Sequence, residues 1–471
     1  MRPAQRFIFL SIFVFVAWYL FLRSPAAKVA VPVEPRDDLP PTVAKFVKKK
    51  LNKARPVTFT IGDEFSLDNL HNIREKLLPW GRASNYVVLC LDEPCMKMTA
   101  GGIKRIDVSM VRGGRGTVLI LFALYLTENN YSFLHVDSDI CLTGTHDPFS
   151  RTLKQTDDSW DVQFMEENDR LDPGFWMSRP SAGTLAYLRA TEALLKDPKN
   201  KGFSATYLLR EGIRGLSLRY HLLDTKDFKS WADYQAWESQ NFATEPQIDV
   251  LIQGTTAIHF TCIDKSIRPY FGKLFGGWSD YNGYYSNIRG RYLTVSGISG
   301  TNDQVINFIA LAIQLAIDSG RILILPYHVE IIQRRMKKVG PDTIPEYKRI
   351  PTFPFYRVVD INSLNGVVDY VESSFALNRE KFTGKEVSLD TLILDEGMLE
   401  LEKETGRPKL ATRVRQQSGA AALSIEFHGF EIRNAAGFEA GVKDYVKRIK
   451  EKLRICRNID ESETACEKRC T

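Results

Sequence analysis

The sequence predicts an α/β protein built on a mostly parallel sheet, followed by a second, smaller α/β domain, with a transmembrane helix at the N-terminus. Two patterns indicate the sheet. Short apolar runs alternate with stretches of helical spacing, and the runs are apolar throughout instead of alternating with polar residues. Strands of a parallel sheet, which helices cover on both faces, have this pattern. The uncharged segment 7–22 indicates the membrane helix.

The composition is that of a globular protein and excludes several classes. Of the 471 residues, 44% are hydrophobic and 25% are charged, which argues against global disorder and against a polytopic membrane protein. The 63 basic residues nearly balance the 57 acidic ones, and this mixed-sign surface argues against a dedicated nucleic-acid-binding protein. Seven cysteines are too few for a disulfide scaffold.

The N-terminal segment predicts the compartment. Arg2 and Arg6 precede the uncharged run, so residues 1–6 are expected to form a cytoplasmic tail and residues 7–22 a signal anchor. The alternative is a cleaved signal peptide, but bulky aromatic residues stand where a cleavage site needs small ones. We therefore expect a single-pass type II protein of the Golgi membrane, with the rest of the chain in the lumen. The proline-rich residues 23–55 are expected to form an unpacked stem.

The first predicted domain spans residues 56–290 and alternates strands with helices. Because parallel sheets bind ligands beyond the carboxyl ends of their strands, Asp92 and Asp137, which follow two of these strands, are expected at a binding edge. Apolar runs predict strands at 57–61, 86–91, 131–136 and 161–164, and helical spacing predicts helices at 63–78, within 108–126 and at 180–195.

The second predicted domain spans residues 291–471 and follows a loop rich in glycine, tyrosine and tryptophan. A Gly/Ser turn at 297–302, an apolar helix at 305–317 and a strand at 321–326 begin a new α/β pattern. Beyond Pro351 the pattern weakens. Residues 442–454 have the spacing of a basic amphipathic helix, which we expect to be a solvated surface helix.

The cysteines are expected to have two different environments. Those in apolar segments are expected to be small buried hydrophobes, and Cys90 and Cys95 lie too far apart for a CxxC redox motif. The C-terminal ones could form a disulfide in an oxidising lumen, with the pairing left open. The first set comprises Cys90, Cys141 and Cys262, and the second Cys456, Cys466 and Cys470.

The strongest local signal is the pair Asp137 and Asp139 at the end of a predicted strand. In a strand, residues i and i+2 point to the same face, so the two carboxylates are presented together. Oxygen ligands of this kind suit Mg²⁺ or Mn²⁺, and such sites recruit substrate phosphates to complete the metal shell. The alternative is two solvated aspartates at a turn, which the apolar strand before them disfavours.

The stretch 85–278 resembles a nucleotide-diphospho-sugar transferase of the GT-A fold and is most similar to glycosyltransferase family 77. The matching segments stand in the expected order along the chain. They are NYVVLCLDEPC at 85–95, a helix opened by glycine and arginine from residue 112, YSFLHVDSDICL at 131–142, DVQF at 161–164, DPGFWMSRPSAGT at 172–184 and AIHF at 257–260.

This resemblance implies a metal-dependent glycosyltransferase that moves a sugar from a nucleotide diphosphate, a UDP-sugar, to a glycan or glycoprotein with retention. It implies that Asp137 and Asp139 are catalytic and bind Mn²⁺ (or Mg²⁺), with His259 as a third ligand. Alternatively, His259 is a structural histidine packed beside Phe260. The resemblance further implies that the donor is bound by Thr60, Gly62, Asp92, Arg115, Gly174 and Phe175, with Glu166, Glu167, Asp169 and Asp172 as acidic candidates nearby.

Two other functions stay open. The chain could be a catalytically silent, membrane-anchored binding protein of the same fold. The segments at 300–304 and 320–326 also look similar to the opening of fucosyltransferase-like nucleotide-sugar folds, which would place an activity in the C-terminal domain. Asn302 and Gln304 would then take part in binding; alternatively, they are residues that only start a helix. The donor sugar, the acceptor and any catalytic nucleophile are left open.

Overall fold

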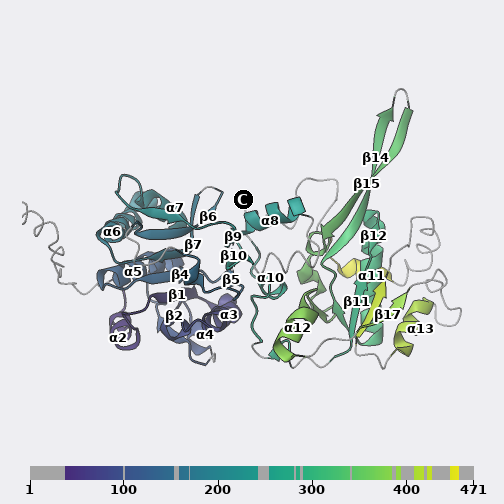
Figure 1. Ribbon diagram of the computed structural model, residues 1–471, viewed down its shortest axis with the longest axis horizontal. Helices are drawn as coiled ribbons and strands as arrows, with labels where there is room; N and C mark the ends of the chain where they lie inside the picture. Colours follow the sequence, from purple (N-terminus) through teal and green to yellow (C-terminus); the bar gives the residue numbers. More distant parts are fainter. Residues whose placement is uncertain are drawn as a thin grey trace, which may run out of the picture. The chain divides into compact units, whose positions relative to one another are not determined.

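Two sheets organise the chain in the computed structural model (Figure 1). The structure describes residues 38–98, 101–152, 159–168, 170–241, 254–261, 263–280, 283–286, 290–339, 342–384, 389–393, 408–417, 422–426, 446–453 and 455. The predicted tail and signal anchor lie outside these residues. In this part of the chain, no helix combines the length and the apolar composition that spanning a bilayer requires. By their contacts, residues 39–471 group into one unit.

The first sheet has seven strands and is mostly parallel, as predicted. In this sheet β7 alone runs against the other strands, and it separates β4 from β6. In sheet order the strands are β3 (Lys104–Asp107), β2 (Tyr86–Cys90), β1 (Val57–Gly62), β4 (Phe133–Val136), β7 (Arg170–Ser178), β6 (Val162–Glu167) and β8 (Tyr220–Leu222). The four strands predicted from apolar runs are β1, β2, β4 and β6.

Strand β7 was not predicted, because Asp172, Pro173 and Gly174 together indicate a turn. The structure resolves this conflict with an irregular pairing: the register of β7 with β6 jumps from Trp176 to Asp172. Such a bulge releases the proline from the ladder and bends the strand, and bulges of this kind redirect nearby side chains.

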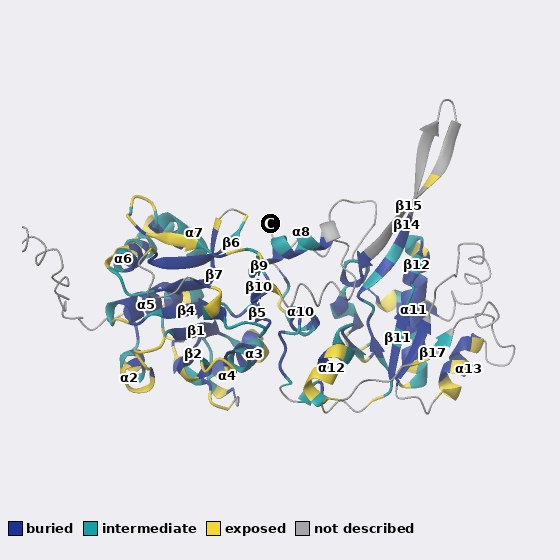
Figure 2. Cartoon of the chain, viewed as in Figure 1, coloured by how far each residue is buried: buried dark blue, intermediate teal, exposed yellow. Residues whose placement is uncertain are grey.

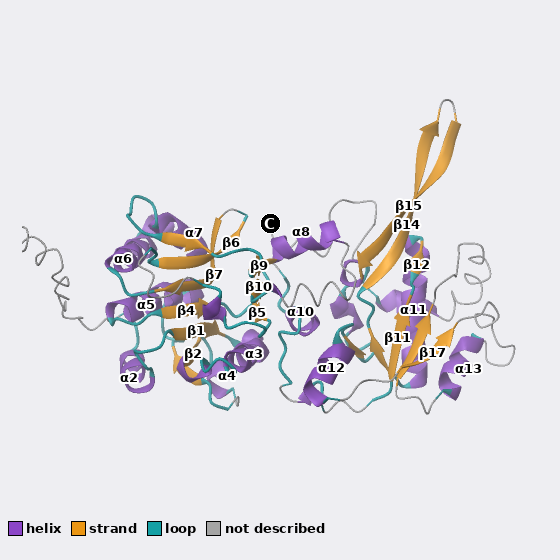
Figure 3. Ribbon diagram, in the orientation of Figure 1, coloured by secondary structure: helices purple, strands orange, loops and turns teal. Residues whose placement is uncertain are grey.

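Helices cover both faces of the first sheet (Figures 2 and 3). Residues 118–127 of α5 are all buried, so this helix has no polar face and belongs to the core. On the face of the sheet that α5 covers, the centre of the Phe59 ring lies 5.0 Å from that of Phe122 and 5.5 Å from that of Phe133. One face packs on α2 (Pro41–Lys50), α5 (Gly114–Glu128), α6 (Ala182–Lys196) and α7 (Ala205–Gly212), and the other on α3 (Leu67–Leu77) and α4 (Glu93–Lys97).

Part of the predicted stem is instead folded onto this sheet. Leu39, Val43, Val47 and Leu51 are buried in the same hydrophobic cluster as α5. Val43 and Val47 lie on one face of α2, and Leu39 and Leu51 flank the helix at the same spacing of four residues. The lysines between them hid this apolar stripe from the sequence-based prediction. The stem prediction is therefore wrong from residue 39 onward, and residues 23–37 lie outside the described part.

The prediction for Cys90 is also wrong, because Cys90 and Cys95 form a disulfide. Strand β2 ends at Cys90 and α4 begins at Glu93, so the chain turns back and brings the two Cα atoms to 5.4 Å. Cys141 is free and buried, as predicted. The predictions for the other cysteines fall outside the described residues: Cys262, Cys456, Cys466 and Cys470.

The second sheet has five strands, and all neighbouring strands are parallel. In order they are β16 (Tyr370–Val371), β13 (Ile322–Ile324), β11 (Tyr292–Ser296), β18 (Ala422–Glu426) and β17 (Leu389–Ile393). The predicted apolar helix is α11 (Asn302–Ser319) and the predicted strand is β13. The helices α12 (Phe375–Thr383) and α13 (Lys409–Gln416) also lie in this part of the chain.

Two smaller sheets complete the described strands. The long hairpin of β14 (His328–Val339) and β15 (Asp342–Pro354) pairs with β12 (Ser299–Gly300), and its charged sequence gave no strand signal. The other sheet joins β5 (Ile140–Leu142), β10 (Ala257–His259) and β9 (Phe228–Ser230).

The hydrophobic core is continuous across residue 290, where the second domain was predicted to begin. One hydrophobic cluster includes Trp231 of α8 (Trp231–Asn241) and Phe271 of α10 (Arg268–Leu274) together with Leu293 and Leu325 of the second sheet region. Near the C-terminus, Val446, Ile449 and Leu453 are buried in the same cluster. The segment expected to be a solvated surface helix therefore packs its apolar side into the core.

Candidate metal and phosphate site

Asp137 and Asp139 stand where the first sheet meets the small sheet of β5, β10 and β9. Asp137 follows β4 directly, and Asp139 precedes β5. The backbone between them is fixed from two sides: the N–H of Asp137 donates to the carbonyl of Gly174 (2.7 Å), and the N–H of Phe260 donates to that of Asp139 (3.0 Å). The loop is therefore held by β7 and by the residue after β10.

His259 comes from β10 and reaches the same place. In the antiparallel pairing of β10 with β5, His259 lies opposite Ile140, directly after Asp139. Its Nε2 is 3.1 Å from Oδ1 of Asp139. Ligand atoms of Asp137, Asp139 and His259 all lie within 4.8 Å of one another, and we call these three residues the Asp-Asp-His group. Two carboxylates and one imidazole are a donor set that suits Mn²⁺ or another divalent cation.

Asp172 of β7 holds the other side of the His259 ring. Its Oδ2 is hydrogen-bonded to Nδ1 of His259, and its Oδ1 accepts the N–H of Gly174 (2.9 Å). The side chain of Asp172 is buried. A carboxylate on one ring nitrogen fixes the orientation and tautomer of a histidine whose other nitrogen binds a metal. Asp172 was predicted only as one of several acidic candidates, and its link to His259 was not.

Gly174 has a steric role beside this histidine. A Cβ atom at Gly174 would lie 2.3 to 2.8 Å from three atoms of the His259 ring, closer than side-chain contacts allow. Only glycine leaves the ring this space. Gly174 therefore belongs to the surroundings of the Asp-Asp-His group, although it does not line the pocket described below.

Opposing charges set the ionisation of this cluster. Burial lowers the pKa of His259, but the carboxylates of Asp172 and Asp139 outweigh it and raise the pKa well above its ordinary value. Burial raises the pKa of Asp139, but His259, Arg268 and Arg115 together lower it to about 2. Without a metal, a protonated His259 thus bridges two ionised carboxylates; a metal ligand must instead be neutral on the coordinating nitrogen.

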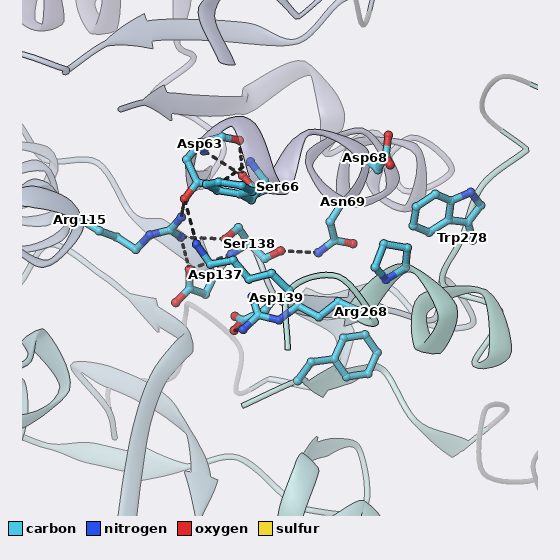
Figure 4. A pocket seen from close by; sticks show the side chains of 14 residues that line it. Asp63, Ser66, Asp68, Asn69, Arg115, Asp137, Ser138, Asp139, Arg268 and Trp278 are labelled. Atoms are coloured by element: carbon cyan, nitrogen blue, oxygen red, sulfur yellow. Dashed lines mark hydrogen bonds and ion pairs between the residues drawn. The ribbon is translucent and has the colours of Figure 1, made fainter. Parts of the chain in front are cut away.

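Cationic side chains surround the carboxylates (Figure 4). Arg115, at the start of α5, donates to Oδ1 of Asp137 (2.9 Å) and to Oδ2 of Asp63 (3.0 Å). Arg268, at the start of α10, donates to Oδ2 of Asp139 (3.1 Å). These residues line a pocket of about 230 Å³. Its other lining residues are Phe65, Ser66, Asp68, Asn69, Ser138, Phe260, Lys265, Pro269 and Trp278.

Of the predicted donor-binding residues, Arg115 lines this pocket and the others do not. Thr60 is buried and accepts a hydrogen bond from the hydroxyl of Tyr86 (3.3 Å). Asp92 caps α4 and accepts the N–H of Glu64 (2.8 Å). The remaining three, Gly62, Gly174 and Phe175, are buried and do not line the pocket.

Four pocket residues that could contact a ligand were not predicted. Asp63 follows β1 directly, at the strand end where a ligand is expected, so its position was a usable signal. Phe65 is 66% exposed. Lys265 and Arg268 follow His259 by six and nine residues, and no sequence periodicity indicates that they return to the carboxylates.

Replacing Asp172 by asparagine is expected to weaken Mn²⁺ binding about tenfold, because the amide holds the His259 ring without supporting its basicity. Isothermal titration with Mn²⁺ would measure the change. Glu167→Gln is the matched control, since Glu167 lies on the same hairpin but accepts from Thr261 (2.9 Å) and not from His259. Equal Mn²⁺ affinities of the two variants would exclude a positioning role for Asp172.

No protein-family model and no curated protein matches the chain. Among solved structures, the galactosyltransferase LgtC in complex with donor and acceptor sugar analogs aligns over 47% of this chain and 96% of its own, with 13% identity and a TM-score of 0.30. The glycosyltransferase GlyE of Streptococcus pneumoniae TIGR4 aligns over 85% of this chain and 100% of its own, with 10% identity and a TM-score of 0.31. POFUT1 in complex with GDP aligns over 35% and 43%, with 16% identity and a TM-score of 0.16. Likenesses this weak do not establish an activity for this chain.

Proposed function

We propose that this chain is a glycosyltransferase of the GT-A fold, similar to family 77, that transfers a sugar from a UDP-sugar to a glycan or glycoprotein and requires Mn²⁺ or Mg²⁺. One observation carries the proposal: both aspartates of the Asp-Asp-His group line a pocket together with Arg115, Lys265 and Arg268. A nucleotide diphosphate needs both features, because carboxylates hold its divalent cation and basic side chains bind its phosphate oxygens.

The basic residues fit the charge that the reaction develops. Cleaving the bond between the sugar and the diphosphate leaves negative charge on the departing phosphate. A divalent cation on the Asp-Asp-His group would act there as a Lewis acid. The planar guanidiniums of Arg115 and Arg268 match pairs of phosphate oxygens, and the half-exposed ammonium of Lys265 adds a mobile charge. In this proposal these three side chains bind and orient the diphosphate.

An exposed aromatic ring supports binding of a nucleobase at the same pocket. Phe65 lines the pocket, and the ammonium of Lys265 lies 4.7 Å from the centre of its ring. Stacking of a base on an aromatic ring contributes about 1–3 kcal/mol. Because stacking does not distinguish one base from another, the choice of UDP rests on the resemblance to family 77.

We propose front-face attack within an ion pair as the route to retention, with no nucleophilic carboxylate assigned. The acidic side chains lining the pocket are Asp63, Asp68, Asp137 and Asp139. Of these, Asp63, Asp137 and Asp139 are ion-paired with arginines, and Asp68 is the one that is not. A double displacement would need a free carboxylate beneath the reacting sugar carbon.

The alternative of an activity near the second sheet has less support. The helix α11 begins with a capping box, in which the side chain of Gln304 accepts the N–H of Thr301 (2.8 Å), so helix capping accounts for Gln304. Asn302 is the first residue of that helix. Within the described residues, the Asp-Asp-His group is the one cluster of His, Cys, Asp and Glu side chains that could hold a metal.

We further propose that the protein is a single-pass type II protein of the Golgi membrane with its catalytic domain in the lumen. The disulfide between Cys90 and Cys95 supports an oxidising compartment, where such bonds persist. Protease digestion of sealed microsomes tests the orientation: the C-terminus should stay protected until detergent is added.

Donor hydrolysis tests the proposed function and separates it from a silent binding protein. The full-length chain is incubated with a panel of UDP-sugars, with Mn²⁺ or with EDTA, and UDP release is measured. The proposal expects release from at least one donor, loss with EDTA and recovery with excess Mn²⁺. Binding of UDP without release from any donor would favour the silent binding protein.

A further inference from the structure

Asp139 has both of its oxygens engaged by cationic groups. Oδ1 lies 3.1 Å from Nε2 of His259, and Oδ2 accepts from Nη2 of Arg268 at 3.1 Å. The side chain of Asp139 is 15% exposed and that of Arg268 is 25% exposed, so water screens this pair only in part. Arg268 therefore occupies one oxygen of a carboxylate that the proposed function assigns to the divalent cation.

Arg268 is attached less firmly to the carboxylates than Arg115. Arg115 is braced by three side chains, since it donates to Asp137, Asp63 and the hydroxyl of Ser138. Arg268 contacts one carboxylate, and its Nε donates to the carbonyl of Ile263 (3.0 Å). This bond holds the root of the guanidinium at the start of α10 while its outer nitrogens face the pocket. If Arg268 turned toward a new partner it would lose one ion pair, whereas Arg115 would lose two.

We propose that Arg268 is the internal counter-ion of Asp139 and couples the binding of the divalent cation to that of the donor diphosphate. Arg268 neutralises Asp139 while the site is free of ligand. It opposes a divalent cation that arrives alone, because the two cations compete for the same carboxylate. When a diphosphate is present, Arg268 transfers its ion pair from Asp139 to the phosphate oxygens. This inference rests on the proposed function and deepens it.

The proposed coupling predicts that each ligand, the metal and the diphosphate, strengthens the binding of the other. With Arg268 on Asp139, metal binding alone must break an ion pair, so it is weak. A diphosphate gives the guanidinium another anionic partner, and thereby strengthens metal binding. By thermodynamic linkage, the metal must strengthen diphosphate binding by the same factor. If Arg268 served only to bind phosphate, substituting it would change the affinity for UDP. The affinity for Mn²⁺ in the absence of UDP would then stay unchanged.

The test is titration of Mn²⁺, with and without saturating UDP, into the full-length wild-type chain and two variants at this position. Arg268→Gln removes the charge, and we expect it to bind Mn²⁺ alone about tenfold more tightly than the wild type. With UDP present it should bind Mn²⁺ no more tightly than the wild type, so that the coupling factor falls at least tenfold. Arg268→Lys keeps the charge and should retain most of the coupling.

Arg82→Gln is the matched control for this experiment. Arg82 also pairs with a single aspartate, Asp147, at 3.0 Å, has a similar exposure of 28%, and does not line the pocket. It should leave both Mn²⁺ affinities as in the wild type. Thermal melting of each variant shows that it is folded.

Two results would count against different claims. If the wild type binds Mn²⁺ more tightly with UDP but Arg268→Gln does not bind Mn²⁺ alone more tightly, the role of Arg268 is refuted and the proposed function stands. If the wild type binds neither Mn²⁺ nor UDP, both the proposed function and the inference drawn from it are refuted.

Discussion

Replacing Asp139 by asparagine is expected to reduce Mn²⁺-dependent donor hydrolysis by at least about a thousandfold. The substitution keeps the size of the side chain but removes one charge and one ligand oxygen from the Asp-Asp-His group. It also leaves His259 and Arg268 without their shared carboxylate. Because each 1.36 kcal/mol of lost transition-state stabilisation is a factor of ten in rate, this requires a loss of only about 4 kcal/mol. UDP release at saturating Mn²⁺ measures the effect.

This variant needs a control for stability, because the side chain of Asp139 is only 15% exposed and pairs with both His259 and Arg268. Its ion pairs hold its pKa near 2, so its ionised form contributes about 2 kcal/mol to folding at neutral pH. Asp161→Asn is the matched control. Asp161 is buried and paired with Arg219 (2.8 Å) away from the pocket, so the variant should lose stability but keep its donor hydrolysis. Activity of Asp139→Asn within a few-fold of the wild type would contradict the site assignment.

His259→Ala is expected to have the second-largest effect, on both metal binding and stability. Loss of a nitrogen ligand should weaken Mn²⁺ binding by about 100-fold or more. In the metal-free protein it leaves the buried carboxylate of Asp172 and the partly buried carboxylate of Asp139 without their shared cation, which should cost about 3–5 kcal/mol. Titration with Mn²⁺ and chemical unfolding in EDTA measure the two effects.

The stability effect of His259 should depend on pH in a predictable direction. Because the folded-state pKa of His259 is raised above the ordinary 6.5, its contribution is fully present below about pH 6.5. It is lost as the pH rises through the folded-state pKa. The difference in metal-free stability between the wild type and His259→Ala should therefore shrink toward alkaline pH. His71→Ala, which removes another buried histidine, should leave Mn²⁺ binding intact.

The two alternatives for His259, metal ligand and packed core residue, are not exclusive in this structure. The side chain is buried, as a core histidine would be, and it also meets both aspartates of the motif. Loss of His259 is therefore expected to weaken metal binding and to destabilise the metal-free protein as well. The pairing of His259 with Asp172 is the physical reason.

Local pattern accounts for most of what could be predicted of the fold. The strands β2 and β13 are continuous apolar runs, β1 and β4 are mostly apolar, and α11 is an apolar helix with a capping box. In these elements local preference and burial agree. The strand β7 was missed because its Asp-Pro-Gly sequence favours a turn, and only pairing with β4 and β6 extends it. The helix α2 was missed because lysines dominate its sequence, and only burial against α5 reveals its apolar face.

The residues of the site likewise fall into two groups, those that local sequence patterns reveal and those that only the tertiary structure brings together. Asp137 and Asp139 could be found because a strand and its end are local features of the sequence. Asp172 could not be paired with His259, because they lie 87 residues apart and meet only through the packing of β7 and β10 around one loop. Lys265 and Arg268 depend on where α10 begins, which the tertiary structure determines. Of the donor residues that the resemblance to family 77 implies, Arg115 lines the pocket, whereas Thr60 is buried and does not line it.

The position of a bound Mn²⁺ tests the central claim most directly. Crystals of the protein grown with Mn²⁺ and UDP, and measured near the manganese absorption edge, would locate the ion by its anomalous scattering. The account predicts one strong anomalous peak bounded by Asp137, Asp139 and His259, with the UDP diphosphate beside it. A peak elsewhere, or UDP bound with no anomalous peak at the Asp-Asp-His group, would contradict it.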